Sequence, residues 1–333
     1  MANAANYLPL SPNDSHTAVA QVHLCHDDCH VTFLLRGISA FDAGGDCGVA
    51  FFFLLSGFVL SLGYGNKIDN GTFRFSDFIR KRLLKVYPLH LLCLLFFLLA
   101  FRPETGLNLV FNVLLLQSWI PVSDYYFSYN GVSWFLSTIL FCYFIFPLAY
   151  RYASRTTLIV GLLCCIAVYL FVPYDMINAV LYVNPLVRSF DFFLGIMLGR
   201  FFKAHGSTIA IPAWSEVLLT LLLVVALIAY PQLDAKWRNA PLYWIILLPT
   251  IFAFAQGRGP LSAVLKCRLL QWLGEISLPV FLIHPLVFRT MYHYFPMLPG
   301  WVMLIVCLSV LILVSWAVNY FILSFLTLNT SKR

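Results

Sequence analysis

Residues 48–92 decide the fold of this chain, and they read GVAFFFLLSGFVLSLGYGNKIDNGTFRFSDFIRKRLLKVYPLHLL. The stretch joins two apolar segments through a loop and the start of a second helix. That connection carries a cluster of six cations, Lys67, Arg74, Arg80, Lys81, Arg82 and Lys85. Apolar anchors beside a compact basic cluster are typical of helices that enter a membrane from its cytoplasmic face.

The composition excludes a water-soluble globule. Of 333 residues, 61% are hydrophobic and only 11% are charged, which leaves too little polar surface to cover a soluble fold. A hydrocarbon core about 30 Å thick needs roughly 20 mostly apolar residues per helix, and such segments recur from Val49 almost to the C-terminus. The sequence therefore predicts an all-α, polytopic transmembrane helical bundle.

Nine long apolar segments are expected to span the membrane. They are 47–63, 86–101, 132–149, 156–173, 184–202, 214–230, 241–256, 276–293 and 300–326. A tenth segment, Leu107–Pro121, has about 15 residues, which suits a short or re-entrant piece better than a crossing. We expect an irregular N-terminal segment over 1–46, one membrane domain over 47–328 and a cytoplasmic tail over 329–333.

The positions of the cations predict the orientation of the bundle. If Leu107–Pro121 does not cross, one set of loops collects 15 of the 21 Lys and Arg residues, and the other side holds Arg36, Arg102, Arg188, Lys236, Arg238 and Arg289. The richer side is expected to face the cytoplasm together with the C-terminus. Because the cations sit in short loops, the net charge of +7 indicates contacts with lipid headgroups and no nucleic-acid partner.

The N-terminal segment lacks two expected features. Residues 1–21, MANAANYLPLSPNDSHTAVAQ, contain no basic region followed by a sustained apolar run, so no signal peptide is recognised. Nine crossings also leave the N-terminus outside without a leading helix, which is unusual. The parity of the spans indicates that one span is missing at the start.

Arg82 and Lys85 form the first candidate site. They lie three residues apart at the start of a helix, so both side chains project from one face about one turn apart. Such a pair can bind the phosphate groups of a soluble donor on the cytoplasmic side. The alternative is a topology signal that contacts lipid phosphates.

Polar residues at the start of another span form a second candidate site. Asn130, Ser133 and Trp134 follow an aromatic run in the sequence DYYFSYNGVSWFLS. Their polar groups could bind sugar hydroxyls while aromatic rings stack on the sugar. The alternative is a helix cap at Asn130 beside an interfacial aromatic belt.

Three further features involve ionisable or metal-binding side chains. His284 lies well inside an apolar span, where ionisable residues are functional hypotheses by default, although a histidine satisfied beside Pro285 is an equal alternative. Arg188 and Asp191, one turn apart, are expected to form a structural ion pair. The dense string His23–His30 offers donors for zinc, but its spacing matches no common zinc site, and no metal is expected.

Five phrases occur in this order along the chain, GVAFFFLLSGFVLSLGY, FIRKRLLKVYPLHLL, NGVSWFLSTILFCYFIFPL, RSFDFFLGIMLGR and LGEISLPVFLIH. Together they resemble the landmarks of the acyltransferase-3 family of integral membrane O-acyltransferases. The resemblance implies a bundle of about ten helices that transfers an acyl group, usually acetyl from cytoplasmic acetyl-CoA, to a hydroxyl of a carbohydrate. The acceptors of the family are often precursors of cell-envelope polysaccharides, which implies a bacterial inner-membrane enzyme.

The resemblance also assigns site residues, with one departure. The basic RxxR motif of the family falls on Arg82 and Lys85, and a lysine keeps the charge but loses bidentate geometry. The family carries an arginine and a histidine on its first span, the histidine being the presumed general base. Alignment on His23 leaves no preceding arginine, whereas alignment on Arg36 puts Cys47 at the histidine position. We favour His23, and expect the first helix to be degenerate or missing.

Three functions compete on this reading. In the first, acetyl-CoA docks on Arg82 and Lys85, a histidine removes the proton of the acceptor hydroxyl, and groups near Ser133 and Trp134 orient the acceptor. In the second, the absent arginine makes the chain an inactive relic of the same fold. In the third, the chain is a transporter or flippase for a lipid-linked sugar, although the paired halves typical of transporters are not found.

Overall fold

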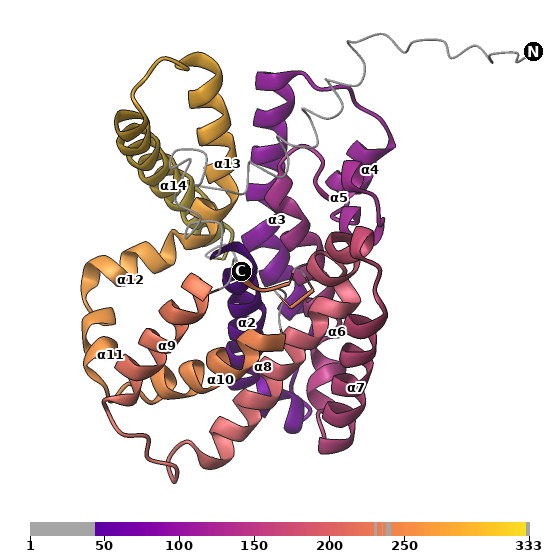
Figure 1. The fold of residues 1–333 in the computed structure, drawn as a ribbon, viewed down its shortest axis with the longest axis vertical. Helices are drawn as coiled ribbons and strands as arrows, with labels where there is room; N and C mark the ends of the chain where they lie inside the picture. The colour runs from indigo at the N-terminus through magenta and orange to yellow at the C-terminus, as the bar shows by residue number, and fades with distance from the viewer. Residues whose placement is uncertain (1–43, 230–231, 235, 238–240, 331–333) are drawn as a thin grey trace, which may run out of the picture.

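The computed structural model describes residues 44–229, 232–234, 236–237 and 241–330, and within these ranges every regular element is helical (Figure 1). In chain order the elements are α2 (Gly44–Asp69), α3 (Phe75–Phe101), α4 (Leu107–Val113), η3 (Gln117–Trp119), α5 (Ser123–Tyr126), η4 (Gly131–Ser133), α6 (Trp134–Arg151), α7 (Arg155–Phe171), η5 (Tyr174–Met176), η6 (Asn178–Tyr182), α8 (Pro185–His205), α9 (Ser215–Ala229), α10 (Pro241–Gln256), α11 (Pro260–Leu265), α12 (Arg268–Glu275), α13 (Ser277–Tyr294) and α14 (Gly300–Thr330). The all-α prediction is confirmed for this part of the chain.

The number of membrane spans is only partly as predicted. Within the described residues, five helical segments are long and apolar enough to cross a membrane, namely α2, α3, η4 with α6, η6 with α8, and α14, and the pair α12 and α13, bent by 63°, would make a sixth. All nine predicted segments contain a helix. However, α7, α9 and α10 have only 17, 15 and 16 residues, so nine long spans are not confirmed.

The short segment after α3 does not form a spanning helix. Leu107–Pro121 contains α4, which has 7 residues, and the single turn η3. At about 1.5 Å per residue, α4 covers roughly 10 Å of a hydrocarbon core about 30 Å thick. The segment is therefore short, as predicted.

Two expected boundaries shift. The first described helix, α2, begins at Gly44, inside the segment 1–46 that was expected to be irregular. At the other end, α14 continues to Thr330, into the segment expected to be a tail. Both helices are extended because a helix can continue past its apolar window for as long as its backbone hydrogen bonds are maintained.

The closest helix pair is α2 with α8, near the centre of the bundle (Figure 1). Glycines allow their backbones to touch, because a methyl group on Gly57 would overlap the carbonyl oxygen of Phe192 and one on Gly195 would overlap that of Leu54. Small residues are used in this way where lipid removes the hydrophobic drive for helix association. The chain-distant helices α2 and α8 thus form the scaffold on which α6 and α10 pack.

Several of the predicted basic segments lie at one end of the bundle. The C-terminal ends of α2, α6 and α8 meet there, since the Tyr150 hydroxyl donates to Asp69 at 2.9 Å, Arg200 donates to the carbonyl oxygen of Tyr150 at 2.8 Å, and Lys203 donates to Asn66 at 2.9 Å. The basic start of α3 follows directly from this end of α2. We call this end of the bundle, where the C-terminal ends of α2, α6 and α8 and the start of α3 lie, the basic end.

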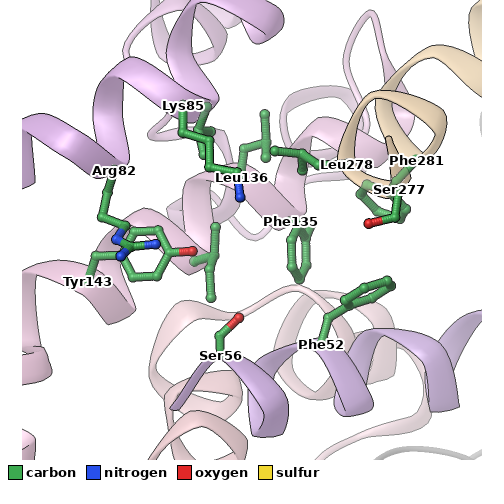
Figure 2. A pocket seen from close by; sticks show the side chains of 12 residues that line it. Phe52, Ser56, Arg82, Lys85, Phe135, Leu136, Tyr143, Ser277, Leu278 and Phe281 are labelled. Atoms are coloured by element: carbon green, nitrogen blue, oxygen red, sulfur yellow. The ribbon is translucent and has the colours of Figure 1, made fainter. Parts of the chain in front are cut away.

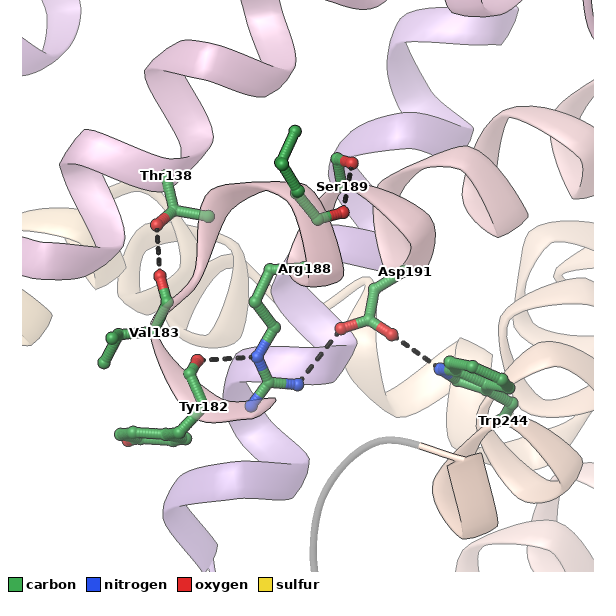
Figure 3. Close-up of polar contacts among 8 residues, drawn as sticks. Thr138, Tyr182, Val183, Arg188, Ser189, Asp191 and Trp244 are labelled. Carbon is green, nitrogen blue, oxygen red and sulfur yellow. Dashed lines mark hydrogen bonds and ion pairs between the residues drawn. The ribbon is translucent and has the colours of Figure 1, made fainter. Parts of the chain in front are cut away.

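The predicted ion pair of α8 is present and buried (Figure 3). Arg188 Nη1 lies 3.1 Å from Asp191 Oδ2, with side-chain exposures of 0% and 1%. Arg188 Nε donates to the Tyr182 carbonyl oxygen, and Trp244 Nε1 donates to Asp191 Oδ1 at 2.6 Å. This set of contacts ties α8 to η6 and to α10.

Candidate functional site

A cavity of about 170 Å³ lies between α2, α3, α6 and α13. Its lining brings together residues more than two hundred positions apart (Figure 2). The lining residues are Phe52, Ser56, Arg82, Lys85, Val86, Phe135, Leu136, Ile139, Tyr143, Ser277, Leu278 and Phe281. Both members of the predicted cationic pair, Arg82 and Lys85, therefore line the same cavity.

Arg82 is held by aromatic rings rather than by a carboxylate. Its Cζ lies 5.7, 5.6 and 5.9 Å from the ring centroids of Tyr64, Phe78 and Tyr143, distances at which a cation and a ring attract each other. Its Nη2 donates a long hydrogen bond of 3.4 Å to the Tyr64 hydroxyl, while its Nε is buried and has no hydrogen-bond partner. No ion pair among the described residues neutralises it.

Lys85 completes the cationic side of the cavity. It is exposed, one turn along α3 from half-buried Arg82, and no described carboxylate pairs with it either. Two like charges at this spacing repel each other. An anion between them would relieve that repulsion and would satisfy the free donor of Arg82.

Three hydroxyl groups line the same space. Those of Ser56 on α2 and Tyr143 on α6 both belong to the lining, and Figure 2 shows Ser277 pointing inward from the start of α13. The sequence reasoning did not single out these residues. Ser56 lies in the phrase FFFLLSGF, but only the packing of four helices shows that its side chain faces a cavity.

Phenylalanines form the opposite side of the cavity. Phe52, Phe135 and Phe281, here called the aromatic wall, have ring centroids 6.2 Å (Phe52 to Phe135), 6.2 Å (Phe52 to Phe281) and 5.3 Å (Phe135 to Phe281) apart. In Figure 2 they lie across the cavity from Arg82. The site is therefore cationic on one side, apolar on the other, and supplied with hydroxyl groups between them.

The predicted acceptor residues do not line this cavity. Asn130 and Ser133 form hydrogen bonds within the protein, although Asn130 Oδ1 is buried without a partner. Asn130 Nδ2 donates to the carbonyl oxygen of Leu282 at 2.9 Å, and the Ser133 hydroxyl accepts from Gln117 Nε2 at 3.2 Å. The side chain of Trp134 is buried, and its ring centroid lies 4.7 Å from that of Tyr182. Their role in binding an acceptor stays a prediction.

A buried polar network behind these residues was not anticipated. His90 Nε2 contacts the carbonyl oxygen of Asn112 at 2.9 Å, and Asn112 Nδ2 donates to the Ser128 carbonyl and hydroxyl oxygens at 3.1 and 3.0 Å. The network fastens the segment containing α4 against α3. An ionisable residue inside the apolar run PLHLL was the sequence signal for His90.

Tyr129, in the aromatic run before Asn130, has a structural role. Burial raises the pKa of the Tyr129 phenol, so the hydroxyl keeps its proton and donates to Asn108 Oδ1 at 3.0 Å. Tyr126 and Phe127 are buried as well, and Tyr125 is half-buried. Most ring faces of this run therefore pack inside the protein.

His284 stands one turn beyond Phe281 on α13. It is half-buried, and its ring centroid lies 6.0 Å from that of Phe281. His284 therefore lies beside Phe281 of the aromatic wall and does not line the cavity.

The predicted base His23 and the string His23–His30 lie outside the described residues, as does Arg36. Within the described ranges, no group of three or more His, Cys, Asp or Glu side chains is arranged to hold a metal ion.

Comparisons with known proteins indicate one family. The family model Acyl_transf_3, described as "Acyltransferase domain", matches residues 15–320. The chain is 30% identical over 278 residues to "Acyltransferase MdmB" of Streptomyces mycarofaciens, which covers 74% of this chain and 68% of that protein. No solved structure matches the chain.

Proposed function

The chain belongs to the acyltransferase-3 family and is a membrane acyltransferase, and on that premise we propose that it transfers acetyl from cytoplasmic acetyl-CoA to a hydroxyl group. The acceptor class that we propose is a carbohydrate or a cell-envelope polysaccharide precursor. The donor and acceptor follow from the resemblance of the five sequence phrases to this family.

One observation supports the donor assignment above the others. Arg82 is a guanidinium held in a ring cage at a cavity, with a buried Nε that has no partner. A buried donor on a charged group is costly when it stays unpaired, so a phosphate that binds there gains a charge-assisted hydrogen bond. Exposed Lys85 adds a second charge one turn away. Phosphate groups of acetyl-CoA fit this donor set.

The cavity accommodates the reacting end of such a donor. A volume of about 170 Å³ suits an acyl thioester, while the remainder of the molecule extends past Lys85. In the transfer, the acceptor oxygen bonds to the carbonyl carbon and the carbon–sulfur bond breaks. A base removes the hydroxyl proton, which ends on the sulfur of the departing CoA. We assign the base to His23, as the resemblance implies.

The orientation of the bundle follows from the same donor. Acetyl-CoA is a soluble molecule of the cytoplasm, so the basic end of the bundle, with Arg82 and Lys85, faces the cytoplasm of a bacterial inner membrane in this proposal. The C-terminus then lies inside. A protease-cleavable tag at the C-terminus should be cut in inside-out vesicles and protected in intact cells; cleavage in intact cells would contradict this orientation.

The reaction is tested with membranes that contain the full chain. Incubation with acetyl-labelled acetyl-CoA is expected to produce label in the carbohydrate fraction that is released by mild alkali, as an O-ester is. Arg82→Ala should abolish this label while the protein still inserts into the membrane. Full activity of Arg82→Ala would refute the donor site.

A neighbouring cation provides the matched control. Arg80 is exposed and lies two residues from Arg82 on α3, but it does not line the cavity. Arg80→Ala removes the same charge from the same helix end. Because the proposal depends on the cavity rather than on total charge, Arg80→Ala should retain most of the activity.

A further inference from the structure

We propose that the aromatic wall, Phe52, Phe135 and Phe281, limits the length of the acyl group that the enzyme accepts. This inference rests on the proposed function, because it assigns the apolar side of the same cavity to the acyl end of the donor. It adds a property that the donor assignment does not contain, namely discrimination between acetyl and longer acyl groups.

The cavity runs from the basic end of the bundle toward the aromatic wall. The C-terminal end of α2 belongs to the basic end of the bundle, so Phe52 lies one turn farther from that end than Ser56 does. On α6, whose C-terminal end is also basic, Phe135 lies eight residues before Tyr143, or about 12 Å at 1.5 Å per residue. The wall is therefore the end of the cavity that is remote from the basic end.

The two ends of the cavity differ in chemistry. A phosphate-bearing donor places its anionic part near Arg82 and Lys85, so its apolar part points toward the wall. A thioester oxygen meets the hydroxyl groups of Ser56, Tyr143 and Ser277, whereas a methyl or longer chain meets the faces and edges of the three rings. Matching apolar surface to apolar surface favours this direction.

The rigidity of the wall comes from Phe135. Phe135 is only 6% exposed, and its ring also lies 4.9 Å from that of Phe53 inside α2. Closely packed rings cannot move aside without opening a void elsewhere. Phe52 is 37% exposed and Phe281 is half-buried, so the packed ring that each added methylene must displace is that of Phe135. Recognition of one methylene in such a pocket typically changes selectivity by about 10- to 200-fold.

Two groups of residues adjoin the wall. Arg82 and Lys85 line the same cavity, whereas His284 contacts Phe281 on α13 and Trp134 precedes Phe135 on α6, and neither lines it. A long acyl chain would have to pass into the region of His284. A short one ends before it.

Binding measurements with the purified full chain test the inference without an acceptor. Dissociation constants are measured for acetyl-CoA, butyryl-CoA and hexanoyl-CoA. The natural chain should bind acetyl-CoA at least about tenfold more tightly than butyryl-CoA. Phe281→Ala, which removes a half-buried ring, should reduce that preference by about tenfold. Phe52→Ala should also reduce the preference for acetyl-CoA.

Two further variants keep the test decisive. Leu278→Phe adds a ring to the lining and should weaken binding of butyryl-CoA relative to acetyl-CoA. Phe144→Ala removes an exposed ring of α6 that does not line the cavity, so it should leave the ratio unchanged.

The two proposals fail in different ways. If acetyl-CoA binds but the ratio is the same in the natural chain, Phe281→Ala and Leu278→Phe, the wall does not select chain length, and the donor site stands. If none of the three thioesters binds, the donor assignment itself is wrong. Equal affinity of the natural chain for all three would overturn the length limit alone.

Discussion

The guanidinium of Arg82 on α3 lies over the ring of Tyr143 on α6, with 5.9 Å between Cζ and the ring centroid. The guanidinium also lies 5.7 Å from the ring centroid of Tyr64 on α2. The side chain of Arg82 is thus positioned by rings of two neighbouring helices, α2 and α6. The orientation of the predicted donor site depends on tertiary packing as much as on the basic motif.

Lys85 should strengthen donor binding through its positive charge, without a bidentate contact to the phosphate. Lys85→Ala is expected to raise the KM for acetyl-CoA by about tenfold, since a hydrogen bond to a charged group is worth about 1.5 to 3 kcal/mol. Lys85→Arg should give a KM equal to or below that of the natural chain, because a guanidinium can bind phosphate in bidentate fashion. Steady-state kinetics at low and high salt measure both. An unchanged KM in Lys85→Ala would exclude Lys85 from the site.

Tyr143 should act through its ring. Tyr143→Phe keeps the cation–ring contact with Arg82 and should retain most donor affinity. Tyr143→Leu removes an interaction of about 0.5 to 2 kcal/mol and should raise the KM for the donor by roughly 2- to 30-fold. If both variants lose donor affinity equally, the hydroxyl is responsible rather than the ring; if both retain it, Tyr143 does not contribute to donor binding.

The contact between α2 and α8 should tolerate no side chain at Gly195. Gly195→Ala is expected to reduce folded protein strongly, because the methyl group overlaps the Leu54 carbonyl oxygen and forces the helices apart. Gly63→Ala on α2 is the matched control, since nothing lies within 4 Å of its added methyl group. Yield and thermal stability in detergent compare them. Equal stability would contradict the close contact.

The buried pair Arg188–Asp191 should be far more sensitive than an exposed pair of the same spacing. Arg188→Met leaves a buried carboxylate without its partner and should cost about 3 to 5 kcal/mol of stability. The control is Arg74→Met, because Arg74 and Asp77 form an exposed pair with the same three-residue separation, where little loss is expected. Thermal unfolding measures both variants, and similar shifts would refute the structural role of the buried pair.

His23 should be required for turnover if it is the general base. His23→Ala is expected to lower kcat by about 10²- to 10⁴-fold, the usual contribution of general base catalysis, while the dissociation constant for acetyl-CoA stays the same. Comparing kcat with direct donor binding separates the two effects. Unchanged turnover would place the base elsewhere, and the same substitution at His284 would then be the next trial.

Local patterns were sufficient for the helices and for the cationic pair. Each of the nine predicted apolar segments contains a helix, because hydropathy over about 20 residues reports the solvent of a segment regardless of its neighbours. Arg82 and Lys85 were identified from spacing alone, since residues three apart share a helix face. The sequence also predicted the pair Arg188–Asp191 by the same rule.

Packing decided the remainder of the site. Ser56, Tyr143 and Ser277 lie on three different helices, and no periodicity within one segment reveals that their side chains face one space. The same limit applies to Asn130 and Ser133, whose polar character suggested acceptor binding but whose hydrogen bonds in the structure are internal. Hydropathy and spacing are properties of one segment, so the sequence by itself determined the membrane fold, its helices and the charge at its basic end. A cavity exists only where several segments meet. Tertiary structure alone therefore decided which side chains surround Arg82 and that the aromatic wall forms the other end of the cavity.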